Sequence, residues 1–244
     1  MKKKMYVLGV AALVTAMLAL SGVAHSAMWV GAEIGGNFPL NTDVKVDAGP
    51  ITGTLTGVGI QPSVIGGAII GYDFVNSGFG GRAWPDWMKY FSFATDVTYN
   101  KFNIKTNQTI GVILNGVNFG NFVGQRDGYL KGYEVAWTFL FMAHYGFLRD
   151  SEVPSGRINP YIGVGPAILW SGIENPVSNG TANAINVALV VEPGIRWMAL
   201  PNVSIDTAMR YRYAAPSYDV GSNTTLTLNP LHQFAFLLRA NYHF

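Results

Sequence analysis

The chain has 244 residues, enough for one large domain or two small ones. Charged residues make up 12% of it, about half the share of an average soluble domain, and hydrophobic residues make up 49%, which excludes a disordered chain. The formal net charge is +2 and there is no cysteine, which excludes disulfides and a lipidated cysteine anchor. So few charges would cover a soluble surface poorly, and the composition therefore indicates a membrane protein.

The first residues carry the features of an export signal. Lys2, Lys3 and Lys4 precede an apolar stretch and then small residues, which predicts a Sec signal peptide over residues 1–27 with cleavage near 24–27. An uncleaved anchor helix is the alternative, although the apolar stretch is short for a membrane span. Removing the three lysines leaves 13 basic against 14 acidic residues, a net charge of −1, so no basic patch for nucleic acid is expected.

After the signal, apolar residues recur at every second position, and no apolar run is long enough for a transmembrane helix. This pattern predicts eight strands. They cover residues 28–38, 63–76, 88–102, 132–147, 159–171, 185–200, 203–213 and 234–244. Each has roughly 10–15 residues, enough for a tilted strand to cross a bilayer.

The two faces of these segments differ in chemistry. One face is apolar and often ends in aromatic residues, as in the girdles of outer-membrane barrels, whereas the other is Gly-rich and holds nearly all the charges. An eight-stranded barrel has an interior just wide enough to be filled by side chains, so we expect a static lumen network rather than a gated polar path. The predicted network consists of Glu33, Asp73, Asp96, Glu134, Glu192, Arg196, Asp206, Arg210, Arg212 and Arg239.

The connections between the predicted strands alternate between long and short. The gaps at 40–62, 103–131, 172–184 and 214–230 are long, whereas "ALPNVS" is a tight turn. Long outer loops with short periplasmic turns are typical of outer-membrane barrels. A lipocalin-like barrel or a β-sandwich is the soluble alternative, but its outward face would carry Lys and Glu. We therefore predict an all-β fold, an eight-stranded antiparallel transmembrane β-barrel of outer-membrane type, in one domain over residues 28–244.

Three stretches carry a resemblance to a known group. "INPYIGVGPAILW", "GIRWMALPNVSIDTAMRYRY" and "LLRANYHF" resemble strands of the small outer membrane β-barrel domain proteins, the group of the OmpA transmembrane domain, OmpX and OmpW-like proteins. The resemblance implies a cell outer membrane location among outer-membrane lipid and lipopolysaccharide. It also implies that Tyr242 and Phe244 form the C-terminal signal read by the barrel assembly machinery. An OmpA-like peptidoglycan-binding domain after Phe244 is not expected.

The sequence offers no catalytic pair. The lipid A deacylase group uses a His-x-Ser pair, but His232 is followed by Gln233 and Phe234, and the alternation turns His232 towards lipid. His144 faces inward on the same strand face as Glu134, and we interpret it as a structural histidine. The histidines are too scattered for a metal site. We therefore expect no enzyme activity, no cofactor and no metal, with a lipid-modifying enzyme as a minor alternative.

The longest loop, 103–131, is apolar for an exposed segment. We expect a hairpin that extends the neighbouring strands and packs on other loops. The alternative is a hydrophobic mouth with a lateral exit, which the OmpW-like resemblance implies, or a contact surface for host molecules. The predicted function is a structural or surface-interaction role, and the alternative is passive passage of small, hydrophobic solutes. The corresponding partner is a host surface ligand or a small hydrophobic solute.

Overall fold

The computed structural model describes residues 28–74, 84–105, 108–124, 131–174, 181–221 and 223–244. The predicted signal peptide at 1–27 lies outside these ranges and stays a prediction. No helix within the described ranges has the length and apolar character needed to cross a membrane.

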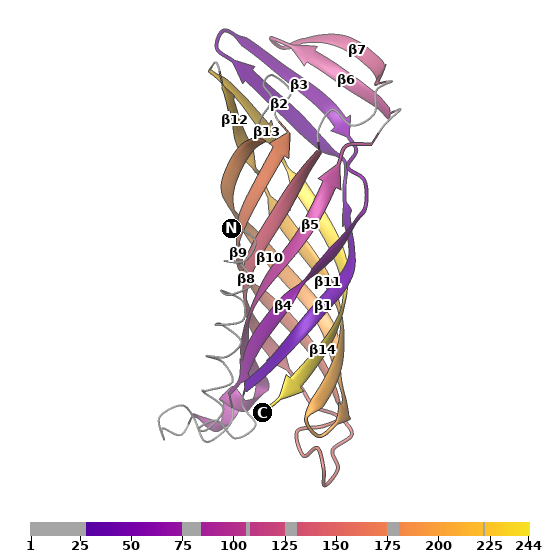
Figure 1. The fold of residues 1–244 in the computed structure, drawn as a ribbon, viewed down its shortest axis with the longest axis vertical. Coiled ribbons are helices and arrows are strands. Elements are labelled where there is room, and N and C mark those ends of the chain that lie inside the picture. Colours follow the sequence, from indigo (N-terminus) through magenta and orange to yellow (C-terminus); the bar gives the residue numbers. More distant parts are fainter. Residues whose placement is uncertain (1–27, 75–83, 106–107, 125–130, 175–180, 222) are drawn as a thin grey trace, which may run out of the picture.

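Eight long strands close into one antiparallel barrel, which confirms the predicted fold class (Figure 1). They are β1 (Met28–Pro39), β4 (Ser63–Asp73), β5 (Phe91–Asn103), β8 (Lys131–His144), β9 (Ile158–Glu174), β10 (Thr181–Leu200), β11 (Val203–Ala214) and β14 (Leu231–His243). Around the barrel their order is β1-β14-β11-β10-β9-β8-β5-β4, so that each strand pairs with its neighbours along the chain and β14 closes against β1. The strands are tilted to the barrel axis, as closure requires.

The alternation of residue types decides which side chains enter the lumen. In β14, Leu237 and Arg239 are buried inside, whereas Phe236 and Leu238 are exposed on the outer wall. Successive side chains of a strand point to opposite faces, so a single register places every second residue of all eight strands in the interior. The outer wall is consequently apolar and the inner wall mixed.

Aromatic side chains gather near both ends of the outer wall. At one end Tyr90 stacks on Tyr145, with ring centroids 5.7 Å apart. At the other end Tyr211 contacts Phe234 at 5.2 Å, and Phe38 contacts Phe236 at 5.9 Å. Two aromatic belts that flank an apolar band are the girdles of an outer-membrane barrel.

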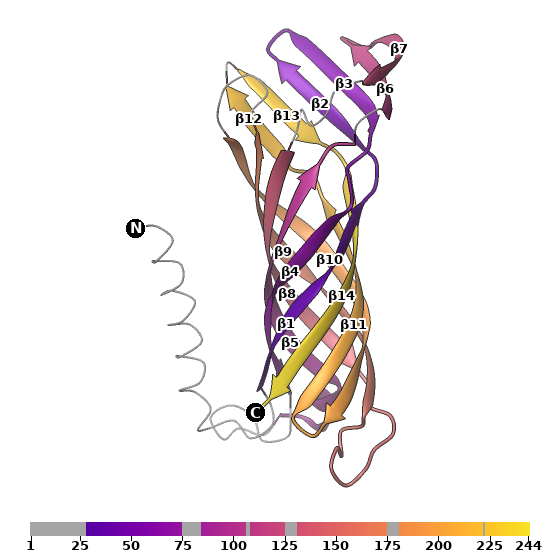
Figure 2. The same ribbon diagram turned by 45° about the vertical axis from the view of Figure 1, so that its right-hand side comes forward.

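Six shorter strands form a second sheet beyond one end of the barrel (Figures 1 and 2). They are β2 (Thr42–Ala48), β3 (Ile51–Val58), β6 (Gln108–Leu114), β7 (Val117–Gly124), β12 (Ser217–Gly221) and β13 (Thr224–Leu228), in the order β12-β13-β2-β3-β6-β7. We call this end of the molecule the loop end, and the opposite end, where β1 starts and β14 finishes, the turn end. The turns of such barrels face the periplasm, and we therefore expect the turn end to be the periplasmic one.

The second sheet is built from three of the long connections. Residues 40–62 and 214–230, for which the sequence indicated only long connections, each contain a hairpin, and 103–131 contains the expected hairpin. A two-residue turn joins β6 to β7, with positive φ at Asn115 (46°) and Gly116 (79°). Asn-Gly favours this type I′ turn because both central residues need a left-handed backbone.

Several strand boundaries also differ from the prediction, among them two at the turn end. The segment predicted at 88–102 begins later, because Asp86–Tyr90 forms the short 3-10 helix η3 and β5 starts at Phe91. Pro85 precedes this helix, and its carbonyl accepts a hydrogen bond from Met88 N at 2.9 Å. The segment predicted at 132–147 ends as a strand at His144.

Two prolines, Pro166 and Pro193, lie inside strands without marking a bulge or a strand end. Pro193 and Pro166 lie in the middle of β10 and β9, where the pairing Pro193↔Ile162 continues in one register with Leu189↔Pro166. Each of these prolines removes one backbone N–H donor from the sheet, and the strand accommodates this loss without an extra residue.

Candidate functional site

The ten charged residues assigned to the lumen by the alternation gather at three levels inside the barrel. Nine of them are buried, and the side chain of Asp73 is part-buried at the turn end. Buried charges are stable only when they are paired and hydrogen-bonded, so their partners decide what the lumen can do.

The middle level centres on Arg210 of β11. Its Nη2 and Nη1 atoms donate to Asp96 Oδ2 and Oδ1 at 2.5 and 3.1 Å, and its Nε donates to Glu192 Oε2 at 2.6 Å. β11 and β5 are four places apart in a ring of eight strands, so Arg210 and Asp96 come from opposite walls. The fork of one guanidinium therefore spans the lumen.

Arg239 of β14 completes this level. Its Nε donates to Glu33 Oε2 at 2.6 Å, on the neighbouring strand β1. Its Nη1 and Nη2 atoms donate to the two oxygens of Glu192 at 2.5 and 2.9 Å, and Nη1 also donates to the Tyr161 hydroxyl at 2.9 Å. Glu192 is thus shared by two arginines, and the five charged residues of this level form one connected network.

The level nearest the turn end is built on Arg196 of β10. Its Nε donates to Asp206 Oδ2 and its Nη1 to Asp73 Oδ2, each at 3.3 Å. Its guanidinium carbon lies 4.4 Å from the Trp29 ring centroid, a cation–π distance. Asp73 lies on β4, four places from β10 around the barrel, so this level also joins opposite walls.

The level nearest the loop end pairs Arg212 of β11 with Glu134 of β8. Gln233 takes part in it: its Nε2 donates to Glu134 Oε2 at 3.3 Å, and its Oε1 accepts from Arg212 Nη1 at 3.2 Å. Gln233 was missed in the sequence because the predicted last strand began at 234. Extending the alternation of β14 backwards by one residue from Phe234 places Gln233 on the inner face.

An apolar cluster lies above this level, beneath the second sheet. It joins Val44, Val58, Leu226 and Leu228 of the sheet to Ile173 near the top of β9, among others. Tyr218 of β12 is buried with this cluster, and its hydroxyl donates to Ser171 Oγ at 2.9 Å. The second sheet therefore has a hydrophobic core of its own that rests on the loop end of the barrel.

A charged, hydrogen-bonded lumen inside an apolar, aromatic outer wall is the inverse of a soluble barrel. Lipid, rather than water, is the surroundings that such an outer wall fits. The chain is an eight-stranded barrel of the outer-membrane type. The resemblance to small outer-membrane barrels stated from the sequence agrees with this architecture.

Comparisons with known proteins found likeness at the level of structure. No family model matches the chain, and no curated protein matches it in sequence. Neisserial surface protein A is 15% identical over 90% of this chain and 98% of its own, with a TM-score of 0.42. The outer membrane protein OprG from Pseudomonas aeruginosa is 13% identical over 91% and 98%, with a TM-score of 0.47. Ail, the attachment invasion locus protein of Yersinia pestis, is 14% identical over 89% and 99%, with a TM-score of 0.40.

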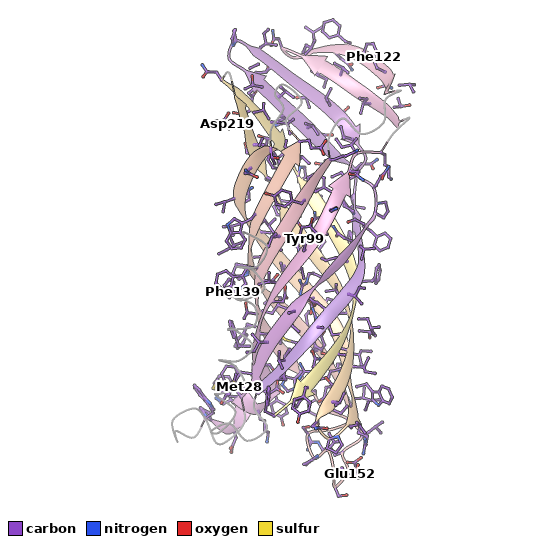
Figure 3. The ribbon with its side chains drawn as sticks, viewed as in Figure 1. Met28, Tyr99, Phe122, Phe139, Glu152 and Asp219 are labelled. Carbon is purple, nitrogen blue, oxygen red and sulfur yellow. The ribbon has the colours of Figure 1, made fainter. Side chains whose placement is uncertain are left out.

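The hairpin of β6 and β7, at the outer edge of the second sheet, is apolar and exposed. Val117, Phe119, Phe122 and Val123 of β7 each expose more than half of their accessible surface. Figure 3 places Phe122 at the loop end and Glu152 at the opposite end of the molecule. Segment 108–124 contains no charged residue. β7 is the last strand in the order of this sheet, so its outer edge has no partner strand among the described residues.

The histidines His232 and His144 lie at opposite ends of the barrel, each near other polar side chains. His232 lies on the outer wall, where its Nδ1 shares a hydrogen bond of 2.7 Å with the Tyr211 hydroxyl and its ring stacks on that tyrosine. His144 lies at the turn end near Asp73 and Arg196, not beside Glu134, whose partners are at the loop end. Across the ranges that the structure describes, no three His, Asp or Glu side chains are grouped to hold a metal ion.

The predicted assembly signal lies on the outer wall at the turn end. Tyr242 is exposed, and its ring meets that of Phe244 edge to face, with centroids 5.3 Å apart. Phe244 N donates to the carbonyl oxygen of Met28 at 3.0 Å, at the seam where β14 meets β1. Recognition of these residues by the barrel assembly machinery stays a prediction.

Proposed function

We propose that this chain is a non-enzymatic outer-membrane barrel with a structural and surface-interaction role. The observation that carries the proposal is that ion pairs join opposite walls of the lumen while a separate sheet, with its own apolar core, rests on the loop end. Side chains that hold each other across the lumen favour a brace over a pathway. The barrel then serves to anchor the sheet among outer-membrane lipid and lipopolysaccharide.

The interaction surface that we propose is strand β7. An exposed strand at the edge of a sheet, without charge or proline, is a template for pairing with another chain. Natural edge strands usually carry charges that prevent such pairing, and β7 has none. We infer that a surface ligand of the host or of another cell adds an extended segment to β7 and covers its apolar side chains, Phe119 and Phe122 among them.

The first experiment tests whether the barrel conducts. The refolded barrel is placed in planar bilayers and in lipid vesicles, and conductance is measured together with the entry of small polar and small apolar probes. A braced barrel gives no conductance steps and no entry of either probe. Heat-modifiable migration on gels verifies in the same sample that the barrel is folded.

Other outcomes of that experiment would favour the alternatives. Entry of apolar probes that is lost when residues 109–123 are replaced by a short turn would favour a passive channel for small hydrophobic solutes. Release of fatty acid from the vesicle lipid would favour a lipid-modifying enzyme. Either result would contradict the present proposal.

A second experiment tests β7 as the interaction surface. Cells that display the protein are scored for binding to host-cell surfaces, and Phe119→Lys with Phe122→Lys is compared with Ile51→Lys. Ile51 is an exposed apolar residue of β3 in the same sheet, so it controls for a general loss of surface hydrophobicity. Binding should fall in the β7 variant and persist in the control. Equal binding by both variants would exclude β7 as the contact.

A further inference from the structure

A cavity of about 600 Å³ opens at the turn end, between η3, the turn joining β8 to β9, and the lower ends of the barrel strands. Five charged side chains line it: Asp73, Lys89, Arg149, Glu152 and Arg196. It lies below the level of the lumen held by Arg196, so it forms a vestibule on the periplasmic side. None of the roles described above uses this vestibule.

The two acids of the vestibule are already engaged. Asp73 accepts from Ser92 Oγ at 2.7 Å and Trp29 Nε1 at 3.1 Å, in addition to its pair with Arg196. Glu152 pairs with Arg157 Nη2 at 2.8 Å. Among the described residues, neither carboxylate forms an ion pair with the two cations at the rim.

Those two cations are Lys89 and Arg149. Within the described ranges neither makes an ion pair with a carboxylate. Instead, Lys89 Nζ lies 5.4 Å from the Tyr90 ring centroid, and the guanidinium carbon of Arg149 lies 6.0 Å from that of Tyr145. The aromatic belt thus holds two positive charges beside the opening, and within the described part of the chain no carboxylate occupies their hydrogen-bond donors.

Two polar atoms at the inner wall of the vestibule lack partners. Arg196 Nη2 and His144 Nε2 are buried, and neither has a hydrogen-bond partner among the described residues. Both side chains line the vestibule and also a void of about 10 Å³ behind it. A buried donor without a partner is costly, and a void of this size is about large enough for one small oxygen group.

We propose that the vestibule binds an oxyanion, a carboxylate or a phosphate, carried by a soluble periplasmic molecule. Lys89 and Arg149 attract the charge at the rim, and an oxygen that enters the small void would meet Arg196 Nη2 and, in the tautomer protonated there, His144 Nε2. Guanidinium and ammonium groups are the usual protein partners of both anions. The site is independent of the lumen's closure and of the proposed role of β7.

The experiment titrates the folded barrel in detergent micelles by calorimetry. The probes are inorganic phosphate, acetate, and a short peptide with a free carboxylate compared with its amide. Lys89→Ala with Arg149→Ala should weaken phosphate binding on the order of tenfold, from two exposed charge contacts. The matched control, Lys101→Ala with Lys131→Ala, removes two exposed lysines on β5 and β8 near the loop end and should leave binding unchanged.

A variant that works in the opposite direction keeps the test decisive. Glu152→Gln removes negative charge from the vestibule without removing any cation, so it should tighten binding, and added salt should weaken binding in every variant. Binding of phosphate alone supports a phosphate carrier as the ligand, and binding of the peptide but not its amide supports a carboxylate. The proposal is overturned if no probe binds to the folded barrel, or if the rim variant and the control bind equally well.

Discussion

Arg210 and Asp96 stand on opposite walls of the barrel and are joined by two hydrogen bonds, of 3.1 and 2.5 Å, across the lumen. Arg196 and Asp73 repeat the relationship nearer the turn end. A closed ring of strands already fixes the positions of neighbours. These pairs fix the positions of strands that are not neighbours, and thereby the cross-section of the barrel.

Replacing Arg210 by Met should destabilise the barrel strongly. The variant leaves the buried carboxylates of Asp96 and, in part, Glu192 without their partner, which costs about 3–5 kcal/mol of unfolding free energy. Unfolding by denaturant in micelles, followed by the gel shift between folded and unfolded forms, measures the loss. Arg210→Met combined with Asp96→Leu should recover much of it, because no uncompensated charge remains at Asp96. A single variant as stable as the wild type would contradict the brace.

The eight crossings could be predicted from the sequence, but the contacts across the lumen could not. The alternation within β14 alone assigns Arg239 to the inner face and Leu238 to the outer face. No information about neighbouring strands is needed for this. The alternation gives the face on which a residue lies. It does not give the position of the residue along the barrel axis or its partner on the opposite wall, because both depend on the stagger of all eight strands. The alternation therefore placed Arg210 and Asp96 on inner faces without indicating that they meet.

The second sheet was missed for a different reason. Its strands are short, and glycine and threonine interrupt the apolar alternation of β3, so the periodic signal is weak there. Asn115-Gly116 is a recognisable hairpin turn flanked by apolar residues, and it could have located β6 and β7 as strands. The pairing of β3 with β6 joins two different loops, and local sequence carries no information about it.

Gly194→Ala should destabilise the barrel through a clash inside the lumen. A Cβ atom at this position would meet the ring of Tyr161. That ring has little freedom to move because its hydroxyl accepts from Arg239 at 2.9 Å. Overpacking of this kind costs about 1–3 kcal/mol. Gly66→Ala is the matched control, because the nearest atom to its Cβ, the Glu33 carbonyl oxygen, is at an ordinary 3.5 Å. Equal denaturation midpoints for the two variants would refute the clash.

Tyr218→Phe should loosen the second sheet without opening the barrel. The variant leaves Ser171 Oγ without its hydrogen bond, at a cost of about 1 kcal/mol. Hydrogen exchange of the β12 and β13 amides should quicken, while that of β5 and β8 should not. Unchanged exchange in β12 would show that the hydroxyl does not hold the sheet down.

The phenol of Tyr218 should also ionise at a higher pH than that of a free tyrosine. Burial raises the pKa of Tyr218 to about 12, because the phenolate would be formed away from water. Since the folded pKa lies above the usual value of about 10, the stability contributed by the neutral phenol is complete below pH 10 and is lost as pH rises towards 12. An ultraviolet difference titration of wild type against Tyr218→Phe should show one phenol ionising in that range. A step near pH 10 would mean that the phenol is in contact with water.

Asp150, in the turn between β8 and β9, should ionise at lower pH than a free aspartate. The hydrogen bond from Arg157, followed by that from Val153 N at 2.7 Å, lowers the pKa of the Asp150 carboxyl. Its contribution to the order of the turn is therefore present above the usual value of about 3.9 and is lost as pH falls through the folded pKa. Carbon-detected NMR titration of the carboxyl measures the midpoint. In Arg157→Gln the midpoint should move up towards the ordinary value, and an unchanged midpoint would contradict the assignment.

Four of the six lumen acids lie on other strands than the lumen arginines. Glu33, Asp73, Asp96 and Glu134 lie on the first four barrel strands, whereas all four arginines lie on the last four, together with Glu192 and Asp206. The inner face of the first half therefore carries four negative charges, whereas the inner face of the second half carries four arginines and two acids, a net charge of +2. Each of the four arginines pairs with one acid of the first half, so closure of the barrel supplies partners that either half alone would lack.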